Sequence, residues 1–210
     1  MIRAGGSFTL PPPPPLSLQS IDRLILIGGG VGINPFQSMV EDMRNSNDWL
    51  PRELKVLYAT KAVSPIQRRE ILFLNELRQA ISELHRRSVP TSITEEKGEM
   101  QALKEREKPD FKLVHSCDAE LRLFLTGVEL KDIQKMDPNE EQKRQLNTAM
   151  KVQAGRITEK DLDEVLGEVP GRERTLVYVC GPKTMTDTFV EYISSREGME
   201  KQRVMCEKWW

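Results

Sequence analysis

Short apolar runs alternate with amphipathic segments along most of the chain. Within the runs, successive residues are apolar rather than every second one, which is typical of parallel strands covered by helices on both faces. We expect strands over five of these runs, namely Leu24–Ile27, Leu54–Ala59, Leu121–Leu125, Thr175–Cys180 and Val204–Cys206. Between them, apolar residues recur at helical spacing. This spacing predicts helices over Pro35–Arg44, Ile66–Arg87, Glu159–Leu166 and Lys183–Arg196. Thr158, with Asp161 three residues on, is close to a capping box and predicts the start of the third of these helices.

The alternation of strands and helices predicts the fold class. We expect an α/β fold with a doubly wound parallel sheet of about five strands, joined by right-handed crossovers and flanked by helices. Two stretches, residues 88–110 and 131–155, break the alternation because they are rich in charge and poor in apolar positions. We interpret both as charged surface insertions, and the alternative is a role in binding a partner.

Five consecutive prolines, Pro11–Pro15, precede the first predicted strand. Such a run is expected to be extended, in the polyproline II conformation, and it cannot enter the interior of a sheet. We interpret it as a stiff linker, with an SH3-type ligand as the alternative. The predicted organisation is therefore an N-terminal segment and linker over residues 1–20, followed by one globular domain over residues 21–210.

Charge, apolar runs and cysteine spacing limit which partners the protein could bind and in which compartment it could lie. The 210 residues carry a net charge of −1, which argues against nucleic acid or an anionic membrane as the partner. No apolar run approaches the roughly 18 residues that span a bilayer, and residues 1–6 lack the apolar core of a secretory signal. Cys117, Cys180 and Cys206 are widely spaced and form no C-x-x-C pair. We therefore expect free thiols in a reducing compartment, no secretion and no metal site.

A glycine-rich turn follows the first predicted strand. Gly28, Gly29, Gly30 and Gly32 lead directly into Asn34 and the start of a helix. Glycines let a phosphate approach the backbone, and a helix start offers free N–H groups. The spacing is G-x-G-x-G-x-x-P rather than the dinucleotide fingerprint G-x-G-x-x-G, and no carboxylate ends the second strand. The turn predicts a nucleotide site, with a glycine turn that binds nothing as the alternative.

A second glycine turn follows the fourth predicted strand, at Cys180, Gly181 and Pro182. Ligands of open parallel sheets bind beyond the carboxyl ends of the strands, where the strand order reverses. If the first and fourth strands are neighbours, as in the order 3-2-1-4-5, both turns line one crevice. Cys180 is then either a chemical group at the lip of the crevice or a small buried residue that closes a strand.

The chain closes on Glu207, Lys208 and the tandem tryptophans Trp209 and Trp210. Exposed tryptophans at a chain end are unfavourable unless they pack on something. An aromatic side chain at a crevice could stack on a nicotinamide or flavin ring. The alternative is that these tryptophans pack on the surface of their own domain.

Taken in this order, the three motifs resemble the NAD(P)-binding half of the ferredoxin–NADP reductase superfamily. That family has G-G-x-G-x-x-P, then C-G-P-x-x-M, then a Glu-x-aromatic ending, and this chain has Gly29–Pro35, Cys180–Met185 and Glu207–Trp209. The resemblance implies that the cofactor is bound by Gly28, Gly29, Gly30, Val31, Gly32, Asn34, Pro35, Thr60, Cys180, Gly181, Pro182 and Met185. It also implies catalytic roles for Glu207, Cys180 and Trp209: Trp209 shields the flavin and Glu207 helps to organise hydride transfer or proton supply.

The implied activity is hydride transfer between NAD(P)H and FAD, in a domain that binds the nucleotide of a flavin-dependent oxidoreductase. The family's flavin motif, Arg-x-Tyr-Ser/Thr, does not occur in the sequence, and residues 1–20 resemble only the end of the flavin barrel with its linker. FAD is therefore expected only if a flavin domain is supplied, and the partner is that domain or an electron-acceptor protein. The alternative is a non-catalytic nucleotide-binding or regulatory module.

Two finer expectations follow from the resemblance. NADP-specific members place Ser-Arg after the third strand, whereas this chain has Leu125-Thr126-Gly127, which favours NAD(H), with NADP(H) as the alternative. A mitochondrial member of the family shares the Gly155–Lys160 segment and the Glu-Lys-Trp-Trp ending. The resemblance therefore implies a mitochondrial location, and otherwise the expected location is cytoplasmic.

Overall fold

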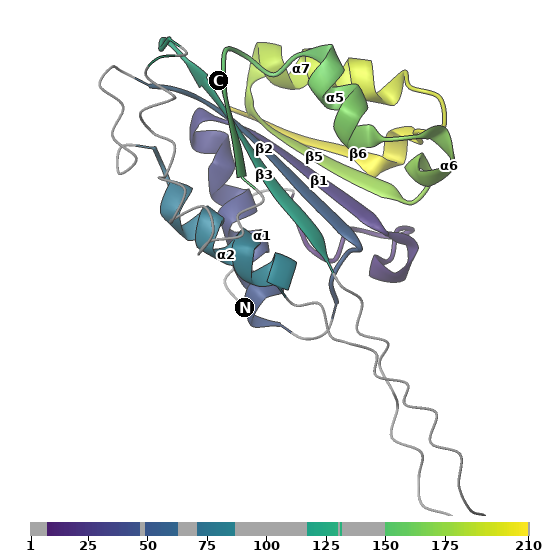
Figure 1. The fold of residues 1–210 in the computed structure, drawn as a ribbon. Coiled ribbons are helices and arrows are strands. Elements are labelled where there is room, and N and C mark those ends of the chain that lie inside the picture. The colour runs from purple at the N-terminus through teal and green to yellow at the C-terminus, as the bar shows by residue number, and fades with distance from the viewer. Residues whose placement is uncertain are drawn as a thin grey trace, which may run out of the picture.

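The computed structural model describes residues 8–46, 49–62, 71–86, 117–129, 131 and 150–209. Within these ranges, six parallel strands form one sheet in the order β4-β3-β2-β1-β5-β6 (Figure 1). They are β1 Arg23–Gly29, β2 Glu53–Lys61, β3 Asp118–Thr126, β4 Met150–Ala154, β5 Thr175–Pro182 and β6 Val204–Trp209. The five predicted strands are confirmed, and so is their order 3-2-1-4-5, which corresponds to β3-β2-β1-β5-β6.

The sixth strand, β4, was not predicted. Met150–Ala154 was expected to belong to a charged insertion, but it pairs with β3 from Leu121 to Leu125 at the edge of the sheet. Its apolar residues Met150, Val152 and Ala154 alternate with polar ones and pack on one face only. An edge strand of five residues with a single apolar face gives a weak pattern, which is why it was missed. Residues 88–110 and 132–149, the rest of the two predicted insertions, lie outside the described residues.

Helices cover both faces of the sheet, as predicted. Figure 1 shows α1 and α2 on one face and α5, α6 and α7 on the other. Their bounds are α1 Asn34–Asn45, α2 Leu74–Arg86, α5 Glu159–Leu166, α6 Val169–Arg172 and α7 Lys183–Ser194. The start predicted for α2 at Ile66 is wrong, because Ile71–Phe73 form a turn in which Phe73 has a φ of 56°. Three 3-10 turns complete the described elements: η1 Leu18–Ser20, η2 Gly30–Ile33 and η4 Lys201–Arg203.

The central strands β1 and β5 are buried on both faces, and their side chains alternate between the two layers. Leu24 and Leu26 of β1 pack under α1 and α2, while Ile25 and Ile27 pack under α5 and α7. The predicted cap of α5 is confirmed: Thr158 Oγ1 accepts from the Asp161 N–H, and the Asp161 carboxylate accepts from the Thr158 N–H at 2.8 Å. The sheet is thus held rigidly between two helical layers.

The N-terminal segment, residues 8–20, packs onto the α1 face of the sheet. The Phe8 ring stacks on Phe36 at 5.8 Å and meets the edge of Tyr178 at 4.9 Å, and the Tyr178 hydroxyl donates to the Thr9 carbonyl at 2.7 Å. The expectation that Pro11–Pro15 is extended is wrong for its second half, because the chain turns at Pro14 and Pro15, where the Leu16 N–H donates to the Pro13 carbonyl. Burial of Phe8 and of nearby leucines in the core favours this turn.

Across the residues that the structure describes, no helix has the length and apolar character needed to cross a membrane.

Candidate functional site

The carboxyl ends of β1, β5 and β6 bring most of the predicted site residues together. Gly28 lies opposite Cys180 in the pairing of β1 with β5, and Cys180 lies opposite Glu207 in the pairing of β5 with β6. Directly paired residues of parallel strands point to the same face, so these three form a row across the sheet. The strand order reverses between β1 and β5, which is where open α/β sheets bind their ligands.

The turn after β1 has one open position, Gly30. Gly30 has a φ of 56°, in the left-handed region, and a Cβ built there would have no heavy atom within 4 Å. Glycine adopts this conformation without strain, and the absent side chain leaves the backbone accessible. The neighbouring Val31 side chain is 58% exposed. The turn therefore presents its backbone to any ligand at the switch point.

Helix α1 begins immediately after this turn without a side-chain cap. Its N-cap residue is Ile33, whose side chain makes no capping hydrogen bond, and Pro35 occupies the first turn of the helix. The Asn34 N–H donates to the Val31 carbonyl, so the N–H groups without an intrahelical partner are those of Gly30, Val31 and Gly32 at the start of η2, which runs directly into α1. These groups and the positive end of the helix dipole favour an anion at this position. Asn34 and Pro35, both predicted site residues, thus define the helix start rather than contribute a charged group.

The other glycines of the two turns are explained by close packing. A Cβ on Gly32 would collide with the Cys180 carbonyl oxygen, and one on Gly181 would lie 3.2 Å from the Gly29 Cα and 2.5 Å from the Met185 Cε. A Cβ on Gly29 would lie 2.8 Å from the Met185 Sδ. Met185 therefore wedges against both turns. These residues let the two turns touch, whereas Gly30 faces open space.

Sequence reasoning missed Thr186, which fixes the second turn to α7. Thr186 is fully buried, and its hydroxyl donates to the Gly181 carbonyl at 3.3 Å. The N-cap of α7 is Pro182, which makes no side-chain cap, so this helix also starts with uncapped N–H groups. The only signal in the sequence was a polar residue on the apolar stripe of a predicted helix.

Cys180 is fully buried among the core side chains that pack under α1 and α2. Its thiol is therefore turned into the core, while its backbone carbonyl lies against Gly32. Glu207, on the same face, is half-buried. The backbone of Trp209 pairs with Pro182, and its side chain lies outside the described part of the structure. The catalytic roles expected of these three residues stay predictions.

An ion-pair cluster joins α7 to the end of β6. The Lys183 ammonium lies 2.6 Å from one oxygen of Asp187, and the Lys208 ammonium lies 2.5 Å from the other. Hydrogen bonds from Lys183 and from Lys208 hold the pKa of the Asp187 carboxyl below its usual value. Lys208 neighbours Glu207 and pairs with Gly181 in the sheet, so the cluster borders the candidate site.

The carboxyl end of β2 lies on the other side of β1. Ala59 pairs with Gly29, and Thr60, the remaining predicted site residue, follows it. The exposed Lys61 comes next, and Gly127 at the end of β3 lies beside its side chain. No acidic residue stands at this strand end, so the ribose-binding carboxylate of the dinucleotide fingerprint is missing here.

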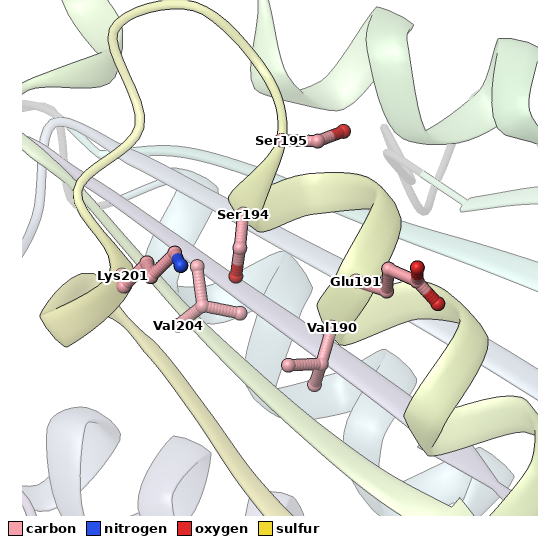
Figure 2. Close-up of a pocket in the computed structure, with 6 residues that line it drawn as sticks. All are labelled: Val190, Glu191, Ser194, Ser195, Lys201 and Val204. Carbon is pink, nitrogen blue, oxygen red and sulfur yellow. The ribbon is translucent and has the colours of Figure 1, made fainter.

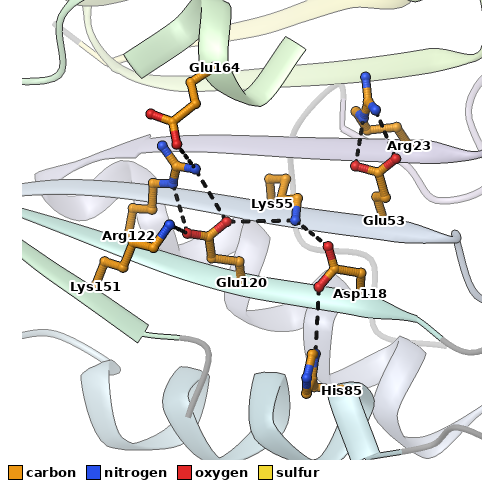
Figure 3. A network of polar contacts seen from close by, with 9 residues as sticks. All are labelled: Arg23, Glu53, Lys55, His85, Asp118, Glu120, Arg122, Lys151 and Glu164. Carbon is orange, nitrogen blue, oxygen red and sulfur yellow. Dashed lines mark hydrogen bonds and ion pairs between the residues drawn. The ribbon is translucent and has the colours of Figure 1, made fainter. Parts of the chain in front are cut away.

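A polar network occupies the amino-terminal half of the sheet (Figure 3). The Arg122 guanidinium lies 3.0 Å from Glu120 and 2.8 Å from Glu164 of α5, while Lys55 and Lys151 also contact Glu120. Burial works against ionisation of Glu120, but hydrogen bonds from Lys151 and Arg122 outweigh it and lower its pKa. Through β2, Arg122 is level with Ile27 of β1, one position before Gly28, but it lies two strands away and contacts Glu164 of α5 on the opposite face from Cys180. The charges of the network satisfy one another.

A shallow pocket of about 520 Å³ lies between the second half of α7 and the start of β6. Figure 2 shows the residues that line it: Val190, Glu191, Ser194, Ser195, Lys201 and Val204. None of the predicted site residues belongs to this lining. Over the described ranges, no group of three or more His, Cys, Asp or Glu side chains is placed to hold a metal ion.

The sheet is doubly wound and parallel, and two glycine turns touch at its switch point. These features define the class of the protein, which is an α/β nucleotide-binding domain. The comparison with protein families agrees and is more specific. The model of the family described as ferric reductase NAD binding domain matches residues 21–194, and the chain belongs to this family. The resemblance to the NAD-binding half of ferredoxin–NADP reductases is thereby confirmed.

Curated relatives share the name oxidoreductase NAD-binding domain-containing protein 1. The chain is 25% identical to those of Pongo abelii and Homo sapiens over 217 residues, covering all of this chain and 51% of each relative. It is 27% identical to that of Danio rerio over 215 residues, covering 59% of the relative. The chain thus spans about half the length of these relatives.

Solved structures show the same fold. The CS-b5R domains of human Ncb5or, in the NAD+ form, superpose with a TM-score of 0.51 at 14% identity, over 90% of this chain and 37% of that one. Flavohemoglobin from Malassezia yamatoensis, with bound FAD and heme, gives a TM-score of 0.51 at 16% identity, over 93% of this chain and 35% of that one.

Proposed function

We propose that the domain binds NADH at the switch point between β1 and β5, as the nucleotide-binding part of a flavin-dependent oxidoreductase. One observation carries the proposal: Gly30 faces open space at the start of η2, a 3-10 turn that has no side-chain cap and leads directly into α1. Backbone N–H groups at such a helix start favour the pyrophosphate of a dinucleotide. Gly29 and Gly32 support this position by letting the two turns pack together.

The two halves of the dinucleotide would extend to opposite sides of β1. In doubly wound folds the adenosine ribose lies near the end of the second strand, so Thr60 and Lys61 would border the adenosine. The nicotinamide would then lie over the other side, near Gly181, Pro182 and Glu207. The lack of a Ser-Arg pair after β3 favours NADH, and Lys61 is the described cation through which NADPH would be accommodated instead.

In this proposal the chain binds and orients NADH, and FAD, held by a separate flavin domain, supplies the hydride acceptor. The pairing of Glu207 with Cys180 puts a half-buried carboxylate on the same face as the first glycine turn. Glu207 would organise the nicotinamide or hold a proton there, and the backbone of Gly181 would border the ring. Trp209 follows in the same strand and would shield the flavin where the nicotinamide docks.

A non-catalytic nucleotide-binding module is the second candidate. It is favoured by one observation: the sequence contains no Arg-x-Tyr-Ser/Thr flavin motif. Supplying NADH, FAD and an artificial electron acceptor distinguishes the two, because turnover by this chain would exclude the second.

The mitochondrial location that the resemblance implies is also a proposal, and a fluorescently tagged full-length protein would test it.

Calorimetric titration with NADH and NADPH tests the binding itself. We expect saturable binding of NADH by the wild-type chain and weaker binding by Gly30→Ala, because a methyl group would stand where the phosphate approaches. Gly155→Ala is the matched control, because Gly155 also has a positive φ, 109°, and open space around its Cβ position. Its cost in backbone strain is at least as large, because a φ of 109° lies outside the left-handed region that other residues reach. Loss of binding in both variants would therefore contradict the assignment of Gly30.

A further inference from the structure

We propose that Lys183, Asp187 and Lys208 form a latch that holds the end of β6 against α7 and thereby strengthens binding of the nicotinamide half of the dinucleotide. The inference rests on the proposed function. Its structural basis is that Asp187 binds one lysine on each carboxylate oxygen, at 2.6 Å and 2.5 Å. Lys183 belongs to the same helix as Asp187, whereas Lys208 belongs to β6.

The latch acts where β6 is held on one side only. β6 is the edge strand of the sheet and pairs with β5 alone. Val204 at its start is buried, as is Arg203 just before it, whereas toward its end Glu207 is half-buried and Lys208 is exposed. The Lys208–Asp187 ion pair therefore ties down the less buried end of the strand.

Alternation along β6 couples the latch to the candidate site. Val204 and Cys206 pack on the side of α7, so Lys208 points to that side as well. Glu207 lies between them in sequence and points to the opposite face, where it is paired with Cys180. A contact that fixes Lys208 thus also fixes the position of the Glu207 carboxylate without touching the ligand, so Lys208 and Asp187 are positioning residues.

The latch should affect one half of the ligand and leave the other unchanged. The adenosine half lies toward β2 and the nicotinamide half toward β5 and β6. ADP-ribose contains the adenosine, pyrophosphate and second ribose but lacks the nicotinamide ring. Loosening the end of β6 should therefore weaken NADH binding while leaving ADP-ribose binding unchanged, which a general loss of folding stability would not do.

The test is calorimetric titration of the full chain with NADH and with ADP-ribose at low ionic strength. For Lys208→Gln we expect NADH affinity to fall about threefold to fivefold, as for the loss of an exposed ion pair, with ADP-ribose affinity unchanged. Lys208→Arg should keep wild-type affinity for both. Lys201→Gln is the matched control, because it removes one exposed lysine at the opposite end of α7.

A salt series and hydrogen exchange complete the test. Salt screens exposed ion pairs, so the difference between wild type and Lys208→Gln should shrink in 0.5 M NaCl. Amide exchange at residues 206–209 should be faster in Lys208→Gln than in Lys201→Gln. Equal losses for NADH and ADP-ribose, or no loss for either, would overturn the latch while leaving the proposed function intact. If the wild-type chain binds neither ligand, the proposed function fails first, and the inference fails with it.

Discussion

Cys180 and Glu207 lie directly opposite each other in the parallel pairing of β5 with β6. Because Gly28 is in turn paired with Cys180, a single row across three strands joins the first glycine turn to the C-terminal strand. Residues that are 179 positions apart in the sequence, from 28 to 207, thus share one face at one edge of the sheet. This row is the geometric basis for treating the motifs as parts of one site.

Packing between the two turns should make Gly32 less tolerant of substitution than Gly30. Gly32→Ala places a methyl group against the Cys180 carbonyl, and overpacking of this kind costs about 1–3 kcal/mol. The two glycine turns would have to move apart to relieve this steric clash. Urea unfolding measures the loss, and a Gly32→Ala protein as stable as the wild type would show that the two turns do not touch as described.

Charge at Gly30 should control NADH affinity. Asparagine and aspartate both tolerate a positive φ and have nearly the same shape, so Gly30→Asn and Gly30→Asp differ mainly by one negative charge. If a pyrophosphate binds here, the aspartate variant should bind NADH about tenfold more weakly than the asparagine variant, which corresponds to about 1.4 kcal/mol. Titrations at two salt concentrations check this, since the difference should shrink with screening. Equal affinities of the two variants for NADH would show that the phosphate does not bind at this turn.

The Tyr178 hydroxyl should anchor the N-terminal segment. A tyrosine hydroxyl is protonated at neutral pH, and burial raises the pKa of Tyr178 further, so its hydroxyl donates to the Thr9 carbonyl. Tyr178→Phe removes that hydrogen bond and should lower the free energy of unfolding by about 0.5–1.5 kcal/mol. Limited proteolysis should then cut residues 8–20 faster. Tyr192→Phe is a control on α7, and cleavage at the wild-type rate in Tyr178→Phe would argue against the anchor.

The network around Arg122 should make stability fall in acid. The pKa of Glu120 is below its ordinary value of 4.5, because hydrogen bonds from Lys151 and Arg122 outweigh the effect of burial. A carboxyl with a lowered folded pKa stabilises the protein above its unfolded pKa, and this contribution is lost as pH falls through the folded pKa. Unfolding free energy should therefore decline below about pH 4.5 and decline less steeply in Glu120→Gln. An identical acid dependence in both proteins would show that other carboxyls cause it.

Much of the fold could be predicted because β1 and β5 are apolar at consecutive positions, and β2 and β3 contain the shorter apolar runs Val56–Ala59 and Leu123–Leu125. Thr158 and Asp161 likewise revealed the start of α5, because a capping box is local in sequence. The turn in the N-terminal segment could not be predicted, since it depends on the distant partners Phe36 and Tyr178. Local conformational preference was overridden there by burial of Phe8.

The residues of the candidate site could be proposed from the sequence, but the different roles of its glycines could not. The glycines all suggested contact with a phosphate, yet Gly29, Gly32 and Gly181 are explained by packing, and Gly30 alone among these four faces open space. That distinction depends on how two turns 150 residues apart meet, which no spacing rule encodes. The Lys208–Asp187 ion pair was missed for the same reason, because its partners come from a strand and a helix that sequence reasoning treated separately.

The most direct test of the central claim is a nitrogen–proton correlation spectrum of the chain titrated with NADH. Binding at the switch point predicts saturable shifts of the amide signals of Gly30, Val31, Gly32 and Gly181. The amides of Val190 and Val204, in the pocket at the other end of α7, should stay unchanged. Shifts confined to that pocket, or no saturable shift at any of these amides, would contradict the assignment of the glycine turns to NADH.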